Sequence, residues 1–243
     1  MDIHKPKPWH GWREFLKEYV IIVVGVLTAL AFEQGVEWLH WRHVTALTED
    51  NLRAGVSDAV LGSIWRIATL PCVNARTVEL TKALAANDAA WKGTTVPILA
   101  GLAKPALPQV IREPKAKYAH SAWDIAVAQG AVLHMQPEKE NLYARVYRRN
   151  ILIEDLQTIE GDLETRLGLL AYNRPLSREQ RDGFMTLLSQ LDSTETRIAS
   201  LNLEMLGDGR LLKIERPPKA DAELARLRSI RGACVRDVAY PGT

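Results

Sequence analysis

The chain has 243 residues, of which 47% are hydrophobic, and its 31 basic and 29 acidic side chains leave a formal net charge of +2 at neutral pH. This length suits one sizeable domain, or one domain with an anchor, and the composition excludes a disordered chain. The balanced charge argues against nucleic acid as a partner, because nucleic-acid-binding proteins carry a basic patch with interleaved aromatic residues. The basic run 145–149 is better explained as the solvated face of a helix.

An uncharged apolar run extends from Tyr19 to Phe32, and apolar residues on both flanks lengthen it. Indole rings suit the interface between lipid and water, since they combine an apolar body with one N–H donor. Four of the seven tryptophans bracket the run, and we expect them at the membrane interfaces: Trp9, Trp12, Trp38 and Trp41. The pattern therefore favours a membrane-spanning helix over 19–39 rather than the core helix of a soluble protein.

A cleaved export signal is the other interpretation of this run, because the small residues at 29–31 resemble a cleavage site. Acidic Glu14 and Glu18 precede the run, where export signals usually carry basic residues. No helix breaker follows the small residues. We therefore expect an uncleaved anchor, in contact with the lipid bilayer.

Basic residues lie mainly before the apolar run, at Lys5, Lys7, Arg13 and Lys17, whereas Arg42 stands alone in the ten residues after Trp38. The excess of positive charge on one side predicts that residues 1–18 are cytoplasmic. Residues 40–243 would then form a domain that faces the periplasm or the cell exterior. There, Cys72 and Cys234 could form a disulfide, although two unpaired buried thiols are an equal alternative.

Small residues recur at four-residue spacing within the anchor, as Gly25 with Ala29 and as Ala31 with Gly35. Such pairs allow two helix backbones to approach closely in lipid. The sequence therefore predicts association of the anchor with another membrane protein or with a second copy.

Apolar residues at three- and four-residue spacing predict helices along nearly the whole remaining chain. Ser177 and Gln180 match a capping box, Gly130 a helix stop and Pro137 a first helical position. The expected helices cover 37–70, interrupted by Pro71, then about 74–86, 121–130, 137–172, 177–209 and 221–235. Prolines make 91–117 an irregular connection. The predicted fold is an all-α antiparallel bundle that continues directly from the transmembrane helix.

Three stretches of the chain form a pattern, namely "EYVIIVVGVLTAL", "WLHWRH" and "AWDIAVAQGAV", with Glu18, Gly25, Trp38, Arg42, Trp123 and Gly130 as its characteristic positions. Together they resemble an uncharacterised family of bacterial single-pass inner-membrane proteins. The resemblance covers the first 45 residues and about 30 near the middle. It implies an inner-membrane location, and it carries no known activity.

No catalytic signature is found in the sequence, so we expect no enzyme activity, cofactor or metal. Glu37, His40 and His43 contain a Glu-x-x-His step, but di-metal helix bundles need a second such step on another helix. Two functional classes remain. The first is an accessory or scaffold subunit docked on a larger membrane assembly; the second is a periplasmic sensor that binds a ligand between its helices. Because few residues precede the anchor to carry a cytoplasmic output, the first class is favoured.

Overall fold

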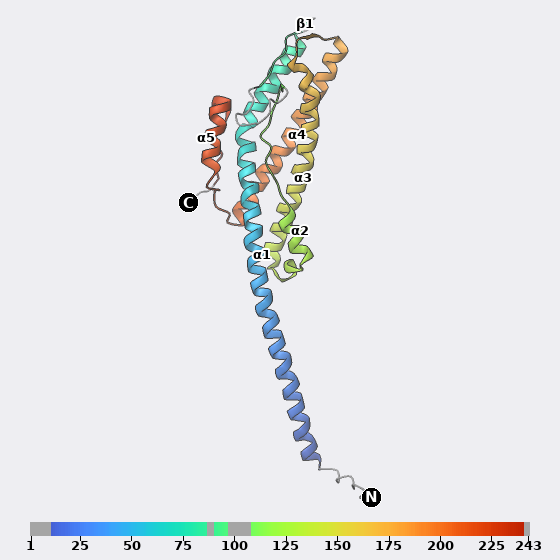
Figure 1. Cartoon of the computed structure of the whole chain (residues 1–243), viewed down its shortest axis with the longest axis vertical. Helices are drawn as coiled ribbons and strands as arrows, with labels where there is room; N and C mark the ends of the chain where they lie inside the picture. Colours follow the sequence, from blue (N-terminus) through green and yellow to red (C-terminus); the bar gives the residue numbers. More distant parts are fainter. Residues whose placement is uncertain (1–10, 87–89, 97–107, 241–243) are drawn as a thin grey trace. The chain divides into compact units, whose positions relative to one another are not determined.

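A computed structural model describes residues 11–86, 90–96 and 108–240, and these are largely helical (Figure 1). The helices are α1 (Trp12–Ala85), α2 (Ser121–Ala128), α3 (Pro137–Leu167), α4 (Arg178–Leu211) and α5 (Ala220–Arg231). Short 3-10 turns follow three of them: η1 (Ala131–His134), η2 (Gly168–Ala171) and η3 (Gly232–Cys234). The strands β1 (Ala90–Trp91) and β2 (Arg174–Pro175) form one antiparallel pair of two residues each. The prediction of an all-α protein is confirmed.

The chain divides into two compact units, Met1–Leu47 and Thr48–Thr243, and α1 contributes residues to both. In the first unit, α1 contains an 18-residue stretch that is apolar enough to cross a membrane, and none of that stretch is buried. Among the described residues, α1 alone has this property. A helix able to span a membrane is therefore present where the sequence predicted it.

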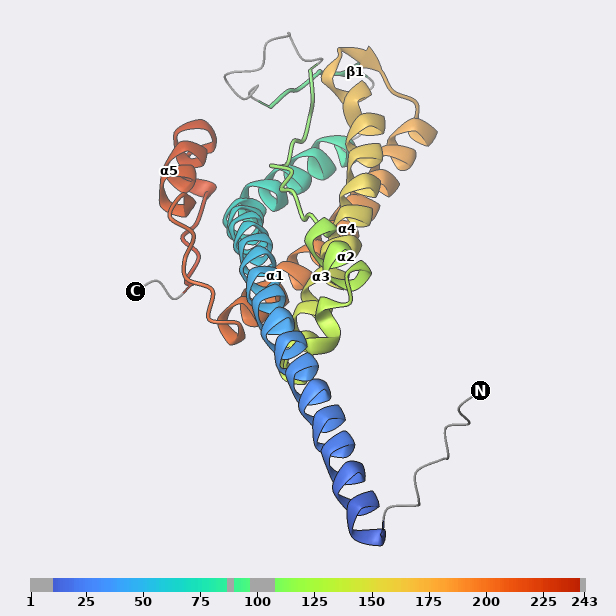
Figure 2. The same ribbon diagram turned by 60° about the horizontal axis from the view of Figure 1, so that its bottom comes forward.

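In the second unit, α1 from Thr48 onwards lies beside α3 and α4, and α3 and α4 run antiparallel (Figures 1 and 2). Tyr147 of α3 donates a 3.0 Å hydrogen bond to the carbonyl of Leu52, and Gly55 lets this tyrosine approach. A Cβ atom at Gly55 would lie 2.4 Å from the Tyr147 hydroxyl. Because Gly55 has no side chain, α1 and α3 can pack closely at this point.

Two hydrophobic core clusters occupy this unit. The first contains Val56, Ile64, Tyr147, Ile198 and Met205 among others. The second contains Leu80, Leu84, Leu167, Leu188 and Leu191 among others. Each of α1, α3 and α4 contributes to both clusters, because each runs the length of the unit.

The extended segment 108–120 runs along the helices, and in the described part of the chain it belongs to no strand (Figure 2). Side chains of α3 replace the missing strand: Gln157 donates to the Ala116 carbonyl at 3.1 Å and Asn150 donates to the Ala119 carbonyl at 2.9 Å. Buried backbone groups need such partners. The buried polar residues of α3 therefore hold this segment against the bundle.

Helix α1 continues through Pro71 to Ala85, so the expected break between two separate helices is wrong. The helix instead changes direction in this region (Figure 2). Proline removes one intrahelical hydrogen bond and bends a helix, but packing on both sides can maintain the helix. Thr69 donates to the Trp65 carbonyl at 2.9 Å just before the proline.

Other helix boundaries also differ from expectation. Helix α4 passes through Gly207 and Gly209 and ends at Leu211, so these glycines do not stop it. Gly209 serves packing instead, because a Cβ atom there would lie 2.7 Å from a methyl group of Val60. Three local predictions are confirmed: the Ser177 capping box, Pro137 at the start of α3, and Gly130 with a left-handed φ of 72°.

The basic run 145–149 is only partly solvated. Arg149 is 6% exposed and pairs with Asp208 and Glu204 of α4, and Arg145 pairs with the same Asp208 at 2.7 Å. Val146 is fully buried. The expectation of a solvated helix face therefore holds for Arg145 and Arg148 and is wrong for Arg149, because the run crosses the interface between α3 and α4.

Candidate functional site

The predicted interface tryptophans lie on the exposed surface of the first unit. Trp12 is 74% exposed, Trp38 is 60% exposed and Trp41 is half-buried, while Trp9 lies outside the described residues. The Arg42 guanidinium stands 5.3 Å from the centre of the Trp38 ring. This cation–π contact combines an aromatic ring and a basic group at one end of the apolar stretch.

The two small-residue pairs of this helix do not share one face. Residues six apart differ by about 120° around a helix axis, which separates Gly25 and Ala29 from Ala31 and Gly35. Ala31 and Gly35 line a shallow apolar groove together with Val24, Leu27, Thr28 and Leu39. Only one of the two pairs can therefore face a given partner helix.

Glu37, His40 and His43 are all exposed in the first unit. Among the described residues, no group of three or more His, Cys, Asp or Glu side chains is arranged to hold a metal ion. The cysteines have a different role. Cys72 of α1 and Cys234 of η3 form a disulfide with an S–S distance of 2.01 Å.

A layer of buried charged side chains separates the two hydrophobic cores of the second unit. Arg66 of α1 lies at its centre, with its Nη1 atom 2.9 Å from Glu160 of α3 and its Nη2 atom donating to Glu195 of α4 at 2.8 Å. The Glu160 contact is an ion pair without hydrogen-bond geometry. Glu113, from the extended segment, lies 3.9 Å from Nη1. We call these four residues the polar layer.

The position of the polar layer follows from the order of residues along α3 and α4. Along α4, Glu195 falls between Leu191 of one core cluster and Ile198 of the other. Along α3, Glu160 falls likewise between Leu156 and Leu163. Each helix thus replaces one apolar residue of its buried stripe by a charged one at the same level. Sliding one helix against another would separate Arg66 from its carboxyl groups, so the layer favours a single alignment.

The polar layer holds more carboxyl groups than cations. Burial raises the pKa of Glu113 to about 8, although Arg66 and Arg231 oppose this rise. Burial also raises the pKa of Glu195, and the neighbouring carboxyl group of Glu160 raises it further. For Arg66, burial alone would lower the pKa, but Glu195, Glu160 and Glu113 outweigh it and the pKa rises. Protonated carboxyl groups reduce the excess of negative charge in the interior.

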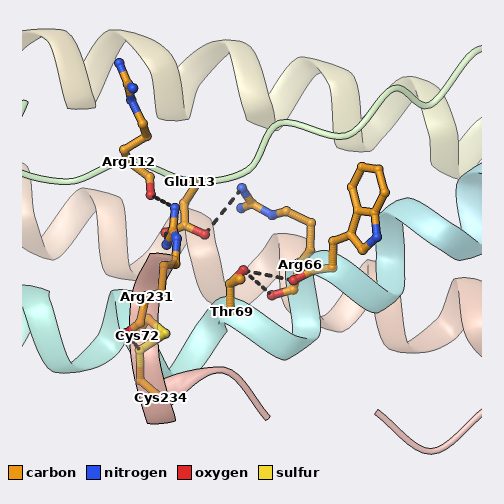
Figure 3. The surroundings of a disulfide bond; sticks show 8 residues. Arg66, Thr69, Cys72, Arg112, Glu113, Arg231 and Cys234 are labelled. Carbon is orange, nitrogen blue, oxygen red and sulfur yellow. Dashed lines mark hydrogen bonds and ion pairs between the residues drawn. A yellow bond between two sulfur atoms is a disulfide. The ribbon is translucent and has the colours of Figure 1, made fainter. Parts of the chain in front are cut away.

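The disulfide attaches α5 and its following turn to α1 beside the polar layer (Figure 3). Arg231, at the end of α5, donates a hydrogen bond to the carbonyl of Arg112, and its Nη1 atom lies 3.5 Å from Oε1 of Glu113. Arg66 approaches the same carboxyl group from the other side (Figure 3). The backbone N–H of Arg236 also donates to Ala68 of α1 at 2.9 Å.

A pocket of about 290 Å³ lies beside this disulfide. Its walls are formed by α1, the extended segment, α5 and η3, and they include Val73, Arg76, Ile111, Glu113, Ile230 and Arg231. Glu113 is 4% exposed, and neither of its carboxyl oxygens accepts a hydrogen bond. The pocket therefore joins an apolar surface to a buried carboxyl group and a guanidinium.

No family model, curated protein or solved structure matches this chain. The assignment of the candidate site therefore rests on the positions and contacts of its own residues.

The sequence predictions missed the polar layer. Glu195 lies in a buried stripe with Leu188, Leu191 and Ile198, at three- and four-residue spacing. The only local signal was a charged residue at a helix position where the spacing predicts a buried apolar residue. The pairing of Glu195 with Arg66, 129 residues earlier in the chain, has no local signature.

Proposed function

We propose that this protein is a non-catalytic accessory subunit that is anchored in the bacterial inner membrane by residues 19–39. In this proposal residues 1–18 are cytoplasmic, residues 40–243 are periplasmic, and the protein belongs to the single-pass family that it resembles. The observation that carries the proposal is the unburied apolar stretch of α1. Burying one large aliphatic side chain gains about 1.5–3 kcal/mol, so a long row of them favours lipid strongly over water.

Two further features support the proposed topology. Lys5, Lys7, Arg13 and Lys17 precede the apolar run, in agreement with the bias of basic residues toward the cytoplasm. The disulfide between Cys72 and Cys234 suits the oxidising periplasm, since disulfides seldom persist in the cytosol.

The location can be tested in membranes isolated from cells that express the full chain. We expect the protein to stay in the pellet after washing with alkaline carbonate. A C-terminal alkaline phosphatase fusion should be active, whereas a C-terminal green fluorescent protein fusion should be dark. Extraction by carbonate would refute the anchor, and a fluorescent C-terminal fusion would refute the orientation.

An accessory role requires a partner in the membrane, and the anchor offers surfaces for one. Nothing lies within 4 Å of a Cβ atom added at Gly25 or Gly35, so a larger side chain would not disturb the isolated helix. We expect Gly35→Leu or Gly25→Leu to reduce chemical crosslinking of the anchor to a neighbouring helix in the membrane, because a bulky residue keeps helices apart. Val26→Leu, which alters no small residue, is the control. Unchanged crosslinking in both glycine variants would exclude association through these faces.

The partner itself can be identified by mild solubilisation of native membranes, purification of the tagged protein and mass spectrometry of what accompanies it. We expect a second membrane protein at a fixed ratio that survives stringent washing. Recovery of the protein as a lone monomer after in-cell crosslinking would contradict an accessory role.

A further inference from the structure

Glu113 is the feature of the second unit that the proposed function leaves unexplained. Its carboxyl group is buried and accepts no hydrogen bond, yet it lines a pocket rather than the closed interior. A buried polar group that makes no hydrogen bond is unfavourable, even with guanidinium groups at ion-pair distance. Such groups often mark the place where a ligand supplies the missing partner.

The charges around Glu113 indicate the kind of ligand. Arg66 lies 3.9 Å from one of its carboxyl oxygens and Arg231 lies 3.5 Å from the other, while Arg76 lines the same pocket. Three guanidinium groups line the pocket, those of Arg76, Arg112 and Arg231, against two carboxyl groups, Glu113 and Glu79, and Glu79 already pairs with Arg76 at 2.8 Å. A ligand cation would therefore meet an excess of positive charge. A ligand anion would be attracted to the guanidinium groups, and Arg231 presents several N–H donors in a planar fork that matches a carboxylate.

Glu113 can contribute to binding an anion in its neutral form. The hydroxyl of a protonated carboxyl group is a hydrogen-bond donor, and the oxygen of a ligand carboxylate would accept from it. Burial raises the pKa of Glu113 to about 8, which favours this form at neutral pH. The group thus acts as a donor beside Arg231 rather than as a competing negative charge.

The remaining walls and the size of the pocket restrict the ligand further. Val73, Ile111 and Ile230 provide apolar surface next to the disulfide. The volume of about 290 Å³ is at the lower end of the range of about 300–1,000 Å³ that is usual for ligand pockets. A compact hydrocarbon or aromatic body with one acidic group fits this combination.

We propose that the pocket between α1, the extended segment and α5 binds a small organic monocarboxylate, with its carboxylate on Arg231 and Glu113 and its apolar body against Val73, Ile111 and Ile230. This inference goes beyond the accessory role and is independent of it, because all the residues involved belong to the second unit. The bound acid would connect α5 to the polar layer through Glu113.

Binding can be measured with the full-length protein in lipid nanodiscs, by titration calorimetry and by ligand-observed NMR. Phenylacetate and hexanoate are suitable probes, and empty nanodiscs correct for their partition into lipid. We expect saturable binding of at least one of the two acids. Phenethylamine, 2-phenylethanol and inorganic phosphate should each bind at least tenfold more weakly, since each lacks either the carboxylate or the apolar body.

Two variants test the location. Arg231→Met should weaken binding by about tenfold or more, because it removes a charged hydrogen-bond donor. Ala75→Trp should abolish binding by filling the pocket, since Ala75 is an exposed residue on the pocket wall. The matched controls are Arg226→Met on the surface of α5 and Ala54→Trp at another exposed position of α1.

Circular dichroism at each step shows whether a variant is folded. If Arg231→Met fails to fold, Ala75→Trp decides the question, because its side chain replaces no core residue. The proposal is overturned if neither acid binds the folded wild-type protein, if phenethylamine binds as tightly as phenylacetate, or if Ala75→Trp binds with unchanged affinity. None of these outcomes bears on the membrane anchor, which the carbonate wash tests separately.

Discussion

Individual buried side chains in the polar layer are expected to control how stability depends on pH. Glu113 and Glu195 lie among Arg66, Arg231, Glu160 and Glu164, and burial raises the pKa of both. Glu113 changes from its usual pKa of 4.5 to about 8 in the folded protein. Between these values the folded state binds more protons than the unfolded state, so stability falls as the pH rises.

We therefore predict that the free energy of unfolding of the second unit decreases by about 2 kcal/mol between pH 6 and pH 8 because of Glu113. Glu195 extends the decrease to higher pH. Denaturant unfolding followed by circular dichroism measures the effect in nanodiscs. Glu113→Gln, which resembles the neutral acid, should make the curve less steep between pH 6 and pH 8, and the slope that remains comes from Glu195. An equally steep curve in this variant would show that Glu113 is not responsible.

Glycines at close contacts provide a second test at the scale of single residues. A Cβ atom added at Gly62 of α1 would lie 2.6 Å from the Ala116 methyl group, which cannot rotate away. Overpacking outweighs the higher helix propensity of alanine, so Gly62→Ala should reduce stability by about 1–2 kcal/mol. Gly183 of α4 is exposed with nothing within 4 Å, and Gly183→Ala should stabilise by up to about 1 kcal/mol. If Gly62→Ala and Gly183→Ala changed the melting temperature equally, the close packing of α1 on the extended segment would be contradicted.

At the scale of elements, local chemistry sets the start of α4. The Ser177 hydroxyl accepts from the Gln180 N–H at 3.2 Å, and the Gln180 side chain accepts from the Ser177 N–H at 3.0 Å. Ser177→Ala should therefore reduce stability by about 1 kcal/mol. Ser193→Ala, at an exposed position in the middle of the same helix, should be neutral or slightly stabilising. Thermal unfolding of both variants distinguishes a capping effect from a general effect of removing a serine.

Element boundaries were predictable where the signal was local and wrong where packing opposed it. Ser177, Pro137 and Gly130 each act within one turn, and the structure agrees with all three. Pro71 and Gly209 are unfavourable in an isolated helix, yet α1 and α4 continue through them. Contacts with neighbouring elements offset the local cost, and a single sequence does not display those contacts.

At the scale of the whole molecule, the disulfide joins two parts of the second unit that are 162 residues apart in the chain. Closing so long a loop restricts the unfolded chain, which stabilises the fold by about 5 kcal/mol in the chain-entropy model. Replacing both cysteines, as Cys72→Ser with Cys234→Ser, should lower the free energy of unfolding by about this amount. Denaturant unfolding of the double variant measures the loss, and a reducing agent should destabilise the wild-type protein similarly. If the fully reduced wild-type protein were as stable as the oxidised protein, the disulfide would not have this role.

The amino-acid sequence by itself determined the helical class, the apolar stretch able to span a membrane and several helix caps, because these depend on residues within a few turns of one another. Only the tertiary structure determined the polar layer, the disulfide between Cys72 and Cys234 and the pocket beside Glu113. Charged residues such as Arg66 and Glu195 resemble solvated residues in the sequence. Burial assigns them another role, since a charge removed from water requires partners that only the folded chain brings within reach.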